Sequence, residues 1–212
     1  CFFMDQVLVT RDQIFRTFWP HLARREATNI FHVTKRKIGE RLAEAAGQPC
    51  ELTRYASGFY RESGLMRRFY DVALFEELAT IGLHSSSADQ RFLALRQALD
   101  IYRGPFLPQN QMPWAVGRRE SFSQLRVDLL VALGDLYRQR GQIAEALREY
   151  HRALEDAPLR EDLHREVMRL YIAQGDAEAA RAQLHQLRDR LPHAMHADTQ
   201  AIADQIDQSA AR

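Results

Sequence analysis

The stretch LGDLYRQRGQIAEALREYHRALEDAP, residues 133–158, decides the fold of the larger part of this chain. When the sequence is compared with itself at a shift of 34 residues, Tyr137 falls on Tyr171 and Gly141 on Gly175. Further positions that correspond under this shift are Ala146 with Ala180, Tyr150 with Leu184, and Pro158 with Pro192. The sequence after this stretch therefore repeats it, one structural unit later.

This period and residue pattern are typical of the tetratricopeptide repeat, in which each unit is a pair of antiparallel helices. Small residues are needed where the two helices cross closely, so we expect Gly134 and Ala146 to meet at that crossing. Gly141 is expected to end the first helix in a left-handed conformation. Pro158 is expected to end the second helix.

The segments on either side of the repeats also have helical patterns. Residues 71–82 and 92–107 carry apolar side chains at helical spacing, with a Gly104-Pro105 stop in the second segment. They predict an irregular helical hairpin, joined by a loop at residues 85–87. Residues 197–208 predict a final helix that covers the open apolar face of the last repeat. Residues 71–212 therefore predict an all-α bundle of about seven helices.

Surfaces of helical repeats commonly bind other proteins, so we expect this bundle to bind a protein partner. The alternative is a scaffold that only positions the neighbouring domain.

Charge is unevenly distributed along the 212 residues. Residues 1–70 contain 12 Lys and Arg against 7 Asp and Glu, a net charge of +5, and the remainder contains 17 against 21, a net charge of −4. This asymmetry favours a polyanion as the partner of the first part. No apolar run approaches the length of a membrane span. Two cysteines make no disulfide framework, so we expect a cytoplasmic protein that does not enter a membrane.

The basic first part opens with a helix and a turn. Thr10 and Gln13 have the spacing of a capping box, and Pro20 ends the helix. A longer helix over residues 24–42 follows. Its apolar side is expected to consist of Ala27, Phe31, Thr34, Ile38 and Leu42. Its opposite side consists of Arg25, Asn29, His32, Val33, Arg36 and Glu40. This arrangement is typical of a helix-turn-helix, although a merely solvated cationic helix has the same pattern.

A predicted β-hairpin after the basic helix favours the first interpretation. Residues 50–63 alternate around a Ser57-Gly58 turn. A hairpin in this place is a wing, whose basic side chains contact phosphates or enter the minor groove. The aromatic residues expected on one face of the hairpin are Tyr55, Phe59 and Tyr60, and the basic residues expected to face the groove or solvent are Arg54 and Arg61.

The order of these segments resembles the DNA-binding and bacterial transcriptional activation domains of the SARP class of regulators. The most specific pieces are Trp19-Pro20, Gly58-Phe59-Tyr60, Asp71 with Phe75, and the residues from Ala98-Leu99 through Tyr102-Arg103-Gly104-Pro105-Phe106-Leu107. The resemblance implies an OmpR-type winged helix that binds the major groove through its third helix. It also implies a helical domain that serves activation and self-association.

Two features depart from this family's pattern. The family's winged helix starts with a short sheet and a first helix, and only CFFMDQV (residues 1–7) corresponds to that helix, so we expect a domain truncated at its N-terminus. The family usually shows Arg-Leu-Arg in the third helix, where this chain has Lys37-Ile38-Gly39, so one basic contact is replaced by glycine.

The fold class that follows is mainly α. A partial winged helix-turn-helix with a β-hairpin wing over residues 1–63 precedes an all-α, tetratricopeptide-like bundle over residues 64–212. The function expected is that of the output part of a bacterial transcriptional regulator. Its partners would be double-stranded DNA, RNA polymerase or another protein, and further copies of the chain. The residues expected to bind DNA are Arg25, Asn29, His32, Val33, Lys35, Arg36, Lys37, Arg54 and Arg61.

The sequence contains no recognisable catalytic arrangement, and we expect neither enzyme activity nor a cofactor. It has no GxxxxGK[ST] motif. No arrangement of His and Asn or Asp partners that would make Cys50 a nucleophile is visible in the sequence. His193 and His196 have the spacing of some metal ligands, but no further ligands accompany them, so we expect no metal. The alternative to a DNA-binding regulator is a protein-interaction scaffold whose winged helix does not bind DNA.

The connection between the two parts is short and apolar. Residues 63–71, SGLMRRFYD, contain four large apolar side chains, Leu65, Met66, Phe69 and Tyr70. We expect these side chains to be buried between the two parts and to form a rigid joint.

Overall fold

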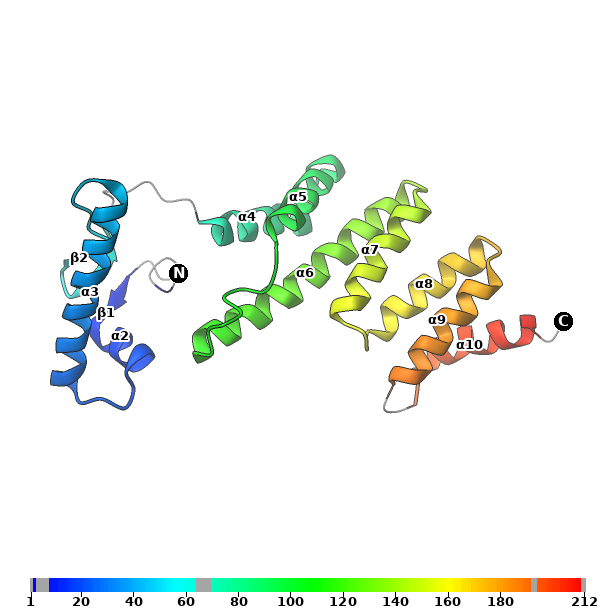
Figure 1. Ribbon diagram of the computed structural model, residues 1–212. Coiled ribbons are helices and arrows are strands. Elements are labelled where there is room, and N and C mark those ends of the chain that lie inside the picture. Colours follow the sequence, from blue (N-terminus) through cyan, green and yellow to red (C-terminus); the bar gives the residue numbers. More distant parts are fainter. Residues whose placement is uncertain (1, 3–7, 64–69, 192–193, 211–212) are drawn as a thin grey trace. The chain divides into compact units, whose positions relative to one another are not determined.

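The computed structural model of this chain describes residues 2, 8–63, 70–191 and 194–210. The chain divides into two compact units (Figure 1). The first consists of Cys1–Tyr70 and Gln109–Val116, and the second of Asp71–Pro108 and Gly117–Arg212. The expected burial of Leu65, Met66 and Phe69 falls outside the described residues, and Tyr70 is half-buried.

Within its described residues, the first unit combines two complete helices with a small antiparallel sheet. Strand β3 is the middle strand, since the strand order is β1-β3-β2. In the hairpin of β2 and β3, Tyr55 lies opposite Tyr60 and Arg54 lies opposite Arg61. The elements are β1 (Val9–Thr10), α2 (Arg11–Phe18), α3 (Arg24–Ala46), β2 (Thr53–Ala56) and β3 (Phe59–Glu62).

Helix α2 begins and ends as its sequence predicts. The hydroxyl of Thr10 accepts from the Gln13 backbone N–H at 3.2 Å, and the Thr10 N–H donates to the Gln13 side chain at 2.8 Å. The capping box is therefore confirmed. Helix α3 starts at Arg24, where the predicted helix starts, but it ends at Ala46, four residues beyond Leu42. The next residue, Gly47, is left-handed with φ of +67°.

The hairpin turn is confirmed, but one of its faces is not as expected. Ser57 and Gly58 have φ values of +52° and +87°, as a two-residue hairpin turn requires. Because neighbouring residues of a strand point to opposite faces, Phe59 shares a face with Arg61 rather than with Tyr60. The expectation that Phe59 and Tyr60 pack on one face was therefore wrong.

The core of the first unit lies between the sheet and the two helices. The rings of Phe31 on α3 and Tyr60 on β3 are 5.0 Å apart. The segment Gln109–Val116, although later in sequence, contributes Trp114, whose ring centroid is 6.5 Å from that of Phe18. The buried members of its hydrophobic cluster, among the described residues, are Val9, Ile14, Phe15, Ala27, Phe31 and Tyr60.

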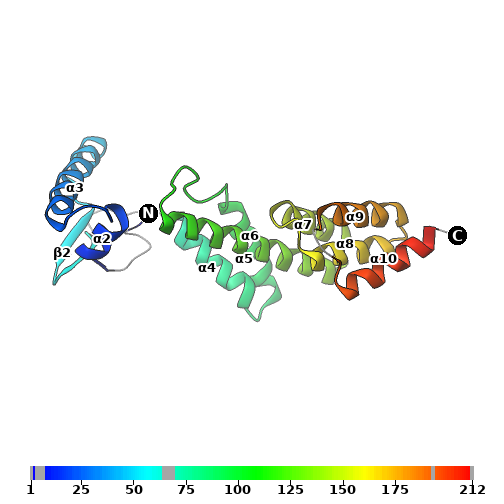
Figure 2. The same cartoon turned by 90° about the horizontal axis from the view of Figure 1, so that it is seen from below.

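The regular elements in the described residues of the second unit are all helices. Helix α4 packs along α5, and α8 packs along α9 (Figure 1 and Figure 2). The first turn of α6 belongs to the first unit and its remainder to the second. The helices are α4 (Asp71–His84), α5 (Ala88–Ile101), α6 (Pro113–Gln139), α7 (Ile143–Asp156), α8 (Glu161–Ala173), α9 (Ala177–Arg190) and α10 (Ala197–Ala210). These are seven helices over the described part of residues 71–212, as expected.

The 34-residue period is reproduced in the helix boundaries. Helices α7 and α9 begin 34 residues apart and end 34 residues apart, and the ends of α6 and α8 have the same separation. The turns are also alike, because Gly141 and Gly175 have φ values of +74° and +78°. The repeat and its glycine turns are therefore confirmed.

At the close helix crossing, the ring of Tyr150 lies nearest to Gly134. Ala146 is fully buried. The atoms nearest to Gly134 nevertheless belong to the ring of Tyr150, and a Cβ at Gly134 would lie 2.7 Å from that ring. The contact that requires glycine is therefore with Tyr150.

Candidate nucleic-acid interface

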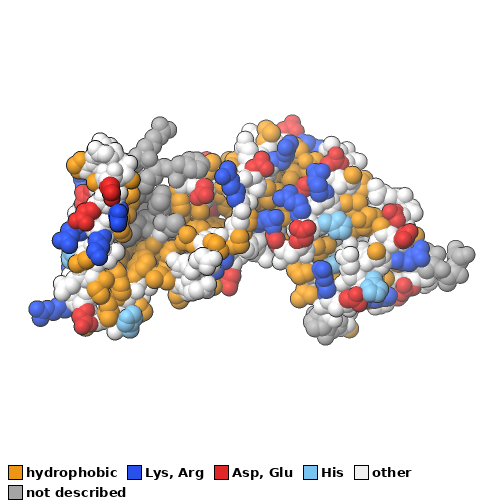
Figure 3. Space-filling model, in the orientation of Figure 1, with side chains coloured by type: hydrophobic (Ala, Val, Ile, Leu, Met, Phe, Trp, Pro, Cys, Tyr) orange, Lys and Arg blue, Asp and Glu red, His pale blue; other side chains and the backbone are white. Residues whose placement is uncertain are grey.

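Helix α3 exposes most of the residues expected to bind DNA on one side. The opposite side holds the helix in place, because Ala27 and Phe31 are buried in the core of the first unit. In Figure 3, Lys and Arg side chains lie beside hydrophobic ones on the visible surface of this unit. The exposed residues among those predicted on this helix are Arg25, Asn29, His32, Val33, Arg36 and Lys37.

Few of the cations on this side are neutralised within the protein. Arg36 lies 3.6 Å from Glu40, and both side chains are largely exposed, at 71% and 65%. Such a pair contributes at most about 1 kcal/mol and is easily exchanged for another anion. Within the described residues, Arg25 and Lys37 have no ion-pair partner.

Lys35 differs from the other predicted residues. Its ammonium group lies 3.3 Å from the carboxylate of Glu51 and 5.7 Å from the ring centroid of Tyr60. It is half-buried, with its side chain 30% exposed. Lys35 therefore ties α3 to the segment before β2 and does not belong to the exposed side.

The hairpin places two further cations directly opposite each other. Arg54 and Arg61 are paired across β2 and β3, and both are exposed. Like charges in this position repel each other. Neither guanidinium has an ion-pair partner in the described part of the chain, so an external anion would relieve the repulsion.

The apolar side of α3 is narrower than its sequence suggests. Thr34 is exposed and Ile38 is 41% exposed, although both were expected to be buried. Both line an apolar cavity of about 190 Å³ that Trp19 and Cys50 also line. The sequence interpretation also omitted Ile30, which is 40% exposed next to Val33. The helical spacing of three residues between them was the available signal.

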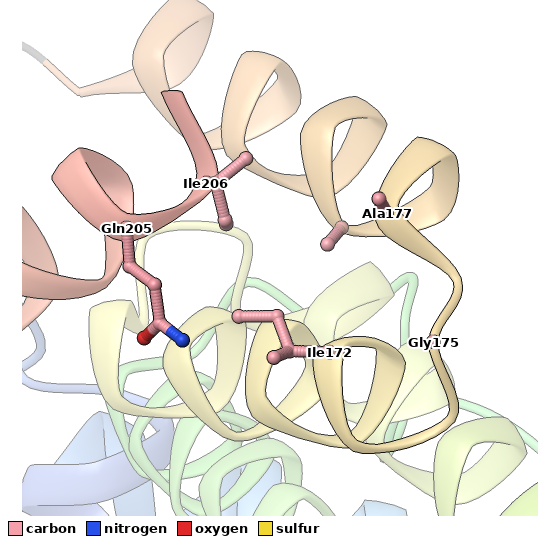
Figure 4. Close-up of a pocket in the computed structure, with 6 residues that line it drawn as sticks. Ile172, Gly175, Ala177, Gln205 and Ile206 are labelled. Atoms are coloured by element: carbon pink, nitrogen blue, oxygen red, sulfur yellow. The ribbon is translucent and has the colours of Figure 1, made fainter. Parts of the chain in front are cut away.

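Two cavities lie among the described residues of the second unit. Ile172, Ala177 and Ile206 point into an apolar cavity of about 200 Å³ between α8, α9 and α10, with Gln205 at its side (Figure 4). A wider groove of about 700 Å³ is lined by residues that include His151, Glu155, His164 and Arg190.

Neither a metal site nor a membrane span is found in the described part of the chain. It contains no cluster of three or more His, Cys, Asp and Glu side chains that could hold a metal ion. His193 lies outside the described residues. None of the described helices is both long and apolar enough to cross a membrane.

The fold and the exposed face together define a tetratricopeptide-like helical-repeat protein with a small basic α/β unit at its N-terminal side. The chain belongs to the bacterial transcriptional activator domain family, whose profile matches residues 70–206. This is a family of transcription regulators and not a class of enzymes.

Comparisons with solved structures extend the shared fold to the first unit. A structure of Mycobacterium tuberculosis EmbR in complex with a low-affinity phosphopeptide matches 95% of this chain with a TM-score of 0.72 at 18% identity. The chain spans 55% of the length of that EmbR chain. A second match is the C-terminal tetratricopeptide-containing domain of a Plasmodium falciparum FK506-binding protein, with a TM-score of 0.46 and 9% identity. The match covers 68% of this chain and 97% of that domain. No curated protein matches by sequence.

Proposed function

We propose that this chain is the output part of a bacterial transcriptional regulator and binds duplex DNA through α3 and the β2–β3 hairpin. In this proposal, residues 1–63 form a winged helix, and residues 64–212 form the activation domain. The observation that carries it is the exposed side of α3, where Arg25, Arg36 and Lys37 face solvent while Phe31 holds the other side in the core.

The chemistry of this surface suits the major groove. An α-helix fits into that groove, where Arg binds guanine and Asn binds adenine through paired hydrogen bonds. We assign base contacts to Asn29, His32 and Arg36, and phosphate contacts to Arg25 and Lys37. Arg54 and Arg61 on the hairpin would contact phosphate or enter the minor groove, as the basic side chains of a wing do.

The helical domain would supply the protein contacts of the regulator. Its family is one of transcription regulators, and stacked helical repeats offer an extended surface for a partner. We propose RNA polymerase or another protein of the transcription apparatus as that partner, and self-association of the chain through the same domain.

The test is the salt dependence of duplex binding, measured by fluorescence anisotropy over about 50 to 200 mM salt. The unmodified chain should show a steep loss of affinity with salt, because each phosphate contact releases counterions. Arg36→Ala should cost about 1–3 kcal/mol on a sequence selected by the chain, and Arg61→Ala should lower the salt slope by about one.

Arg181→Ala is the matched control for the loss of one positive charge. Arg181 is an exposed arginine on α9 and, among the described residues, donates only to the carbonyl of Ala177 in its own helix, at 3.0 Å. This variant should bind as the unmodified chain does. Binding that is absent at every salt concentration would reject the proposal and favour the alternative, a protein-interaction scaffold whose winged helix does not bind DNA.

A further inference from the structure

Two aliphatic side chains stand on the same exposed side of α3 as the cations. Val33 is 44% exposed and Ile30 is 40% exposed. Residues three or four apart are neighbours on a helix surface. Val33 is therefore next to Ile30, and Asn29, Arg36 and Lys37 surround it.

These side chains have no structural role that the described contacts reveal. Neither belongs to the core cluster of the first unit. Each is β-branched, which makes it less favourable in a helix than Ala, Leu or Lys. A single exposed aliphatic residue is ordinary, but this pair lies among the side chains that the proposed function places against DNA bases.

Thymine is the one base that offers an apolar group at this place. Its C5-methyl group projects into the major groove, where apolar side chains contact it, whereas the other three bases present only polar edges there. A contact of Val33 with this methyl group would remove apolar surface of both partners from water.

On these grounds, and resting on the proposed function, we propose that Val33, assisted by Ile30, recognises a thymine methyl group in the bound sequence. Asn29 and Arg36 then set its position. The rise of an α-helix places their Cα atoms about 6 and 4.5 Å along the axis from that of Val33. Base pairs are about 3.4 Å apart, so the thymine lies one or two base pairs from the bases that Asn29 and Arg36 contact.

The experiment exchanges thymine for deoxyuridine, which differs only in lacking the methyl group. Duplexes are first selected with the whole 212-residue chain from a random library, and each thymine of a selected duplex is then replaced singly. We expect one replacement to weaken binding about fourfold, the equivalent of about 0.8 kcal/mol for one buried carbon group. Replacements elsewhere in the duplex should have no effect.

Val33→Ala completes a double-mutant cycle with that duplex. The variant should bind the thymine duplex less tightly and bind the thymine and deoxyuridine duplexes equally. Because Val33 is outside the core, the variant should fold, and its helical circular dichroism checks this. Ile81→Ala, which removes a 38% exposed aliphatic side chain from α4, is the matched control and should leave the fourfold preference unchanged.

The outcomes separate this inference from the proposed function. If the chain binds duplexes with a steep salt slope but no deoxyuridine replacement matters, the thymine contact is refuted while DNA binding stands. A preference for thymine that survives in Val33→Ala would also refute it, because another residue would then read the methyl group. If no duplex is bound at any salt concentration, both proposals fail.

Discussion

At the scale of single residues, Tyr150 explains why a glycine stands inside the long helix α6. Its ring is fully buried, and its hydroxyl donates to the carboxylate of Asp135 at 2.7 Å. Burial and this carboxylate raise the pKa of Tyr150 above its ordinary value, so the hydroxyl stays protonated. The ring is therefore held by its bond to the backbone of α7 at one end and by Asp135 at the other. Gly134 leaves room for this ring, because it has no side chain.

We predict that Gly134→Ala lowers the free energy of unfolding by about 1–3 kcal/mol, because overpacking a fixed ring outweighs the better helix propensity of alanine. Gly117→Ala is the matched control in the same helix, with open space around its Cβ position. It should raise the free energy of unfolding by up to about 1 kcal/mol. Urea unfolding followed by circular dichroism measures both, and equal effects of the two substitutions would contradict the role of the Tyr150 contact.

His164 is a fully buried titratable residue at the junction of the two repeats. Its Nε2 lies 3.1 Å from the carbonyl oxygen of Pro158, which can only accept, so this nitrogen carries the proton. Its Nδ1 then accepts from the side-chain amide of Gln183. Burial lowers the pKa of His164 below the ordinary value of 6.5.

We predict that stability falls as the pH drops below about 6.5, because there the unfolded chain binds more protons at this position than the folded one does. The contribution of His164 to the free energy of unfolding should be constant above this range. His164→Gln should weaken the pH dependence, and His151, whose pKa burial also lowers, should account for part of the remainder. An unaltered pH dependence in His164→Gln would show that His164 is not responsible.

At the scale of elements, local signals placed the repeats well and α5 less well. The prediction of residues 92–107 began at the first large apolar residue, Phe92, and so omitted a polar first turn that Ser87 caps through the Gln90 N–H. It also ran past Ile101, because Tyr102 and Phe106 pack against the core from a non-helical segment. Apolar spacing alone does not distinguish such a segment from a helix.

Other features depend on contacts that are distant in sequence. Strand β1 contains only Val9 and Thr10 and is defined by its pairing with β3, some fifty residues later. The exposed side of α3 followed from its helical period, whereas the position of Lys35 followed from Glu51, which lies outside the helix. The sequence could therefore indicate which side of α3 is exposed but not which of its cations are already engaged.

At the scale of the whole molecule, the two units have separate cores. Among the described residues, the buried members of the hydrophobic cluster of the first unit lie between Val9 and Tyr60. The two hydrophobic clusters of the second unit use only residues from Val72 to Ile206. The charge asymmetry follows the same division, +5 over residues 1–70 against −4 over the remainder.

We predict that a fragment of residues 71–212 folds but does not bind duplex DNA, because it keeps both of its own clusters and loses the basic unit. Circular dichroism should show a helical fragment with cooperative thermal unfolding. Anisotropy should show no salt-dependent binding at concentrations where the whole chain binds. A fragment that kept the salt slope of the whole chain would place the DNA contacts in the helical domain.

The matching boundaries of α7 and α9 limit how this chain can change in length. One residue inserted within α8 would turn every later side chain of that helix by about 100° about its axis, since a helical turn takes 3.6 residues. If the insertion preceded Leu163, the side chains of Leu163 and Val167 would turn away from the hydrophobic cluster in which they are buried. Duplication of a complete 34-residue unit ahead of α10 would instead pack each added helix against the same kind of helix that its original copy packs against. Insertions and deletions of whole repeats are therefore the changes in length that the helical domain can most readily accommodate.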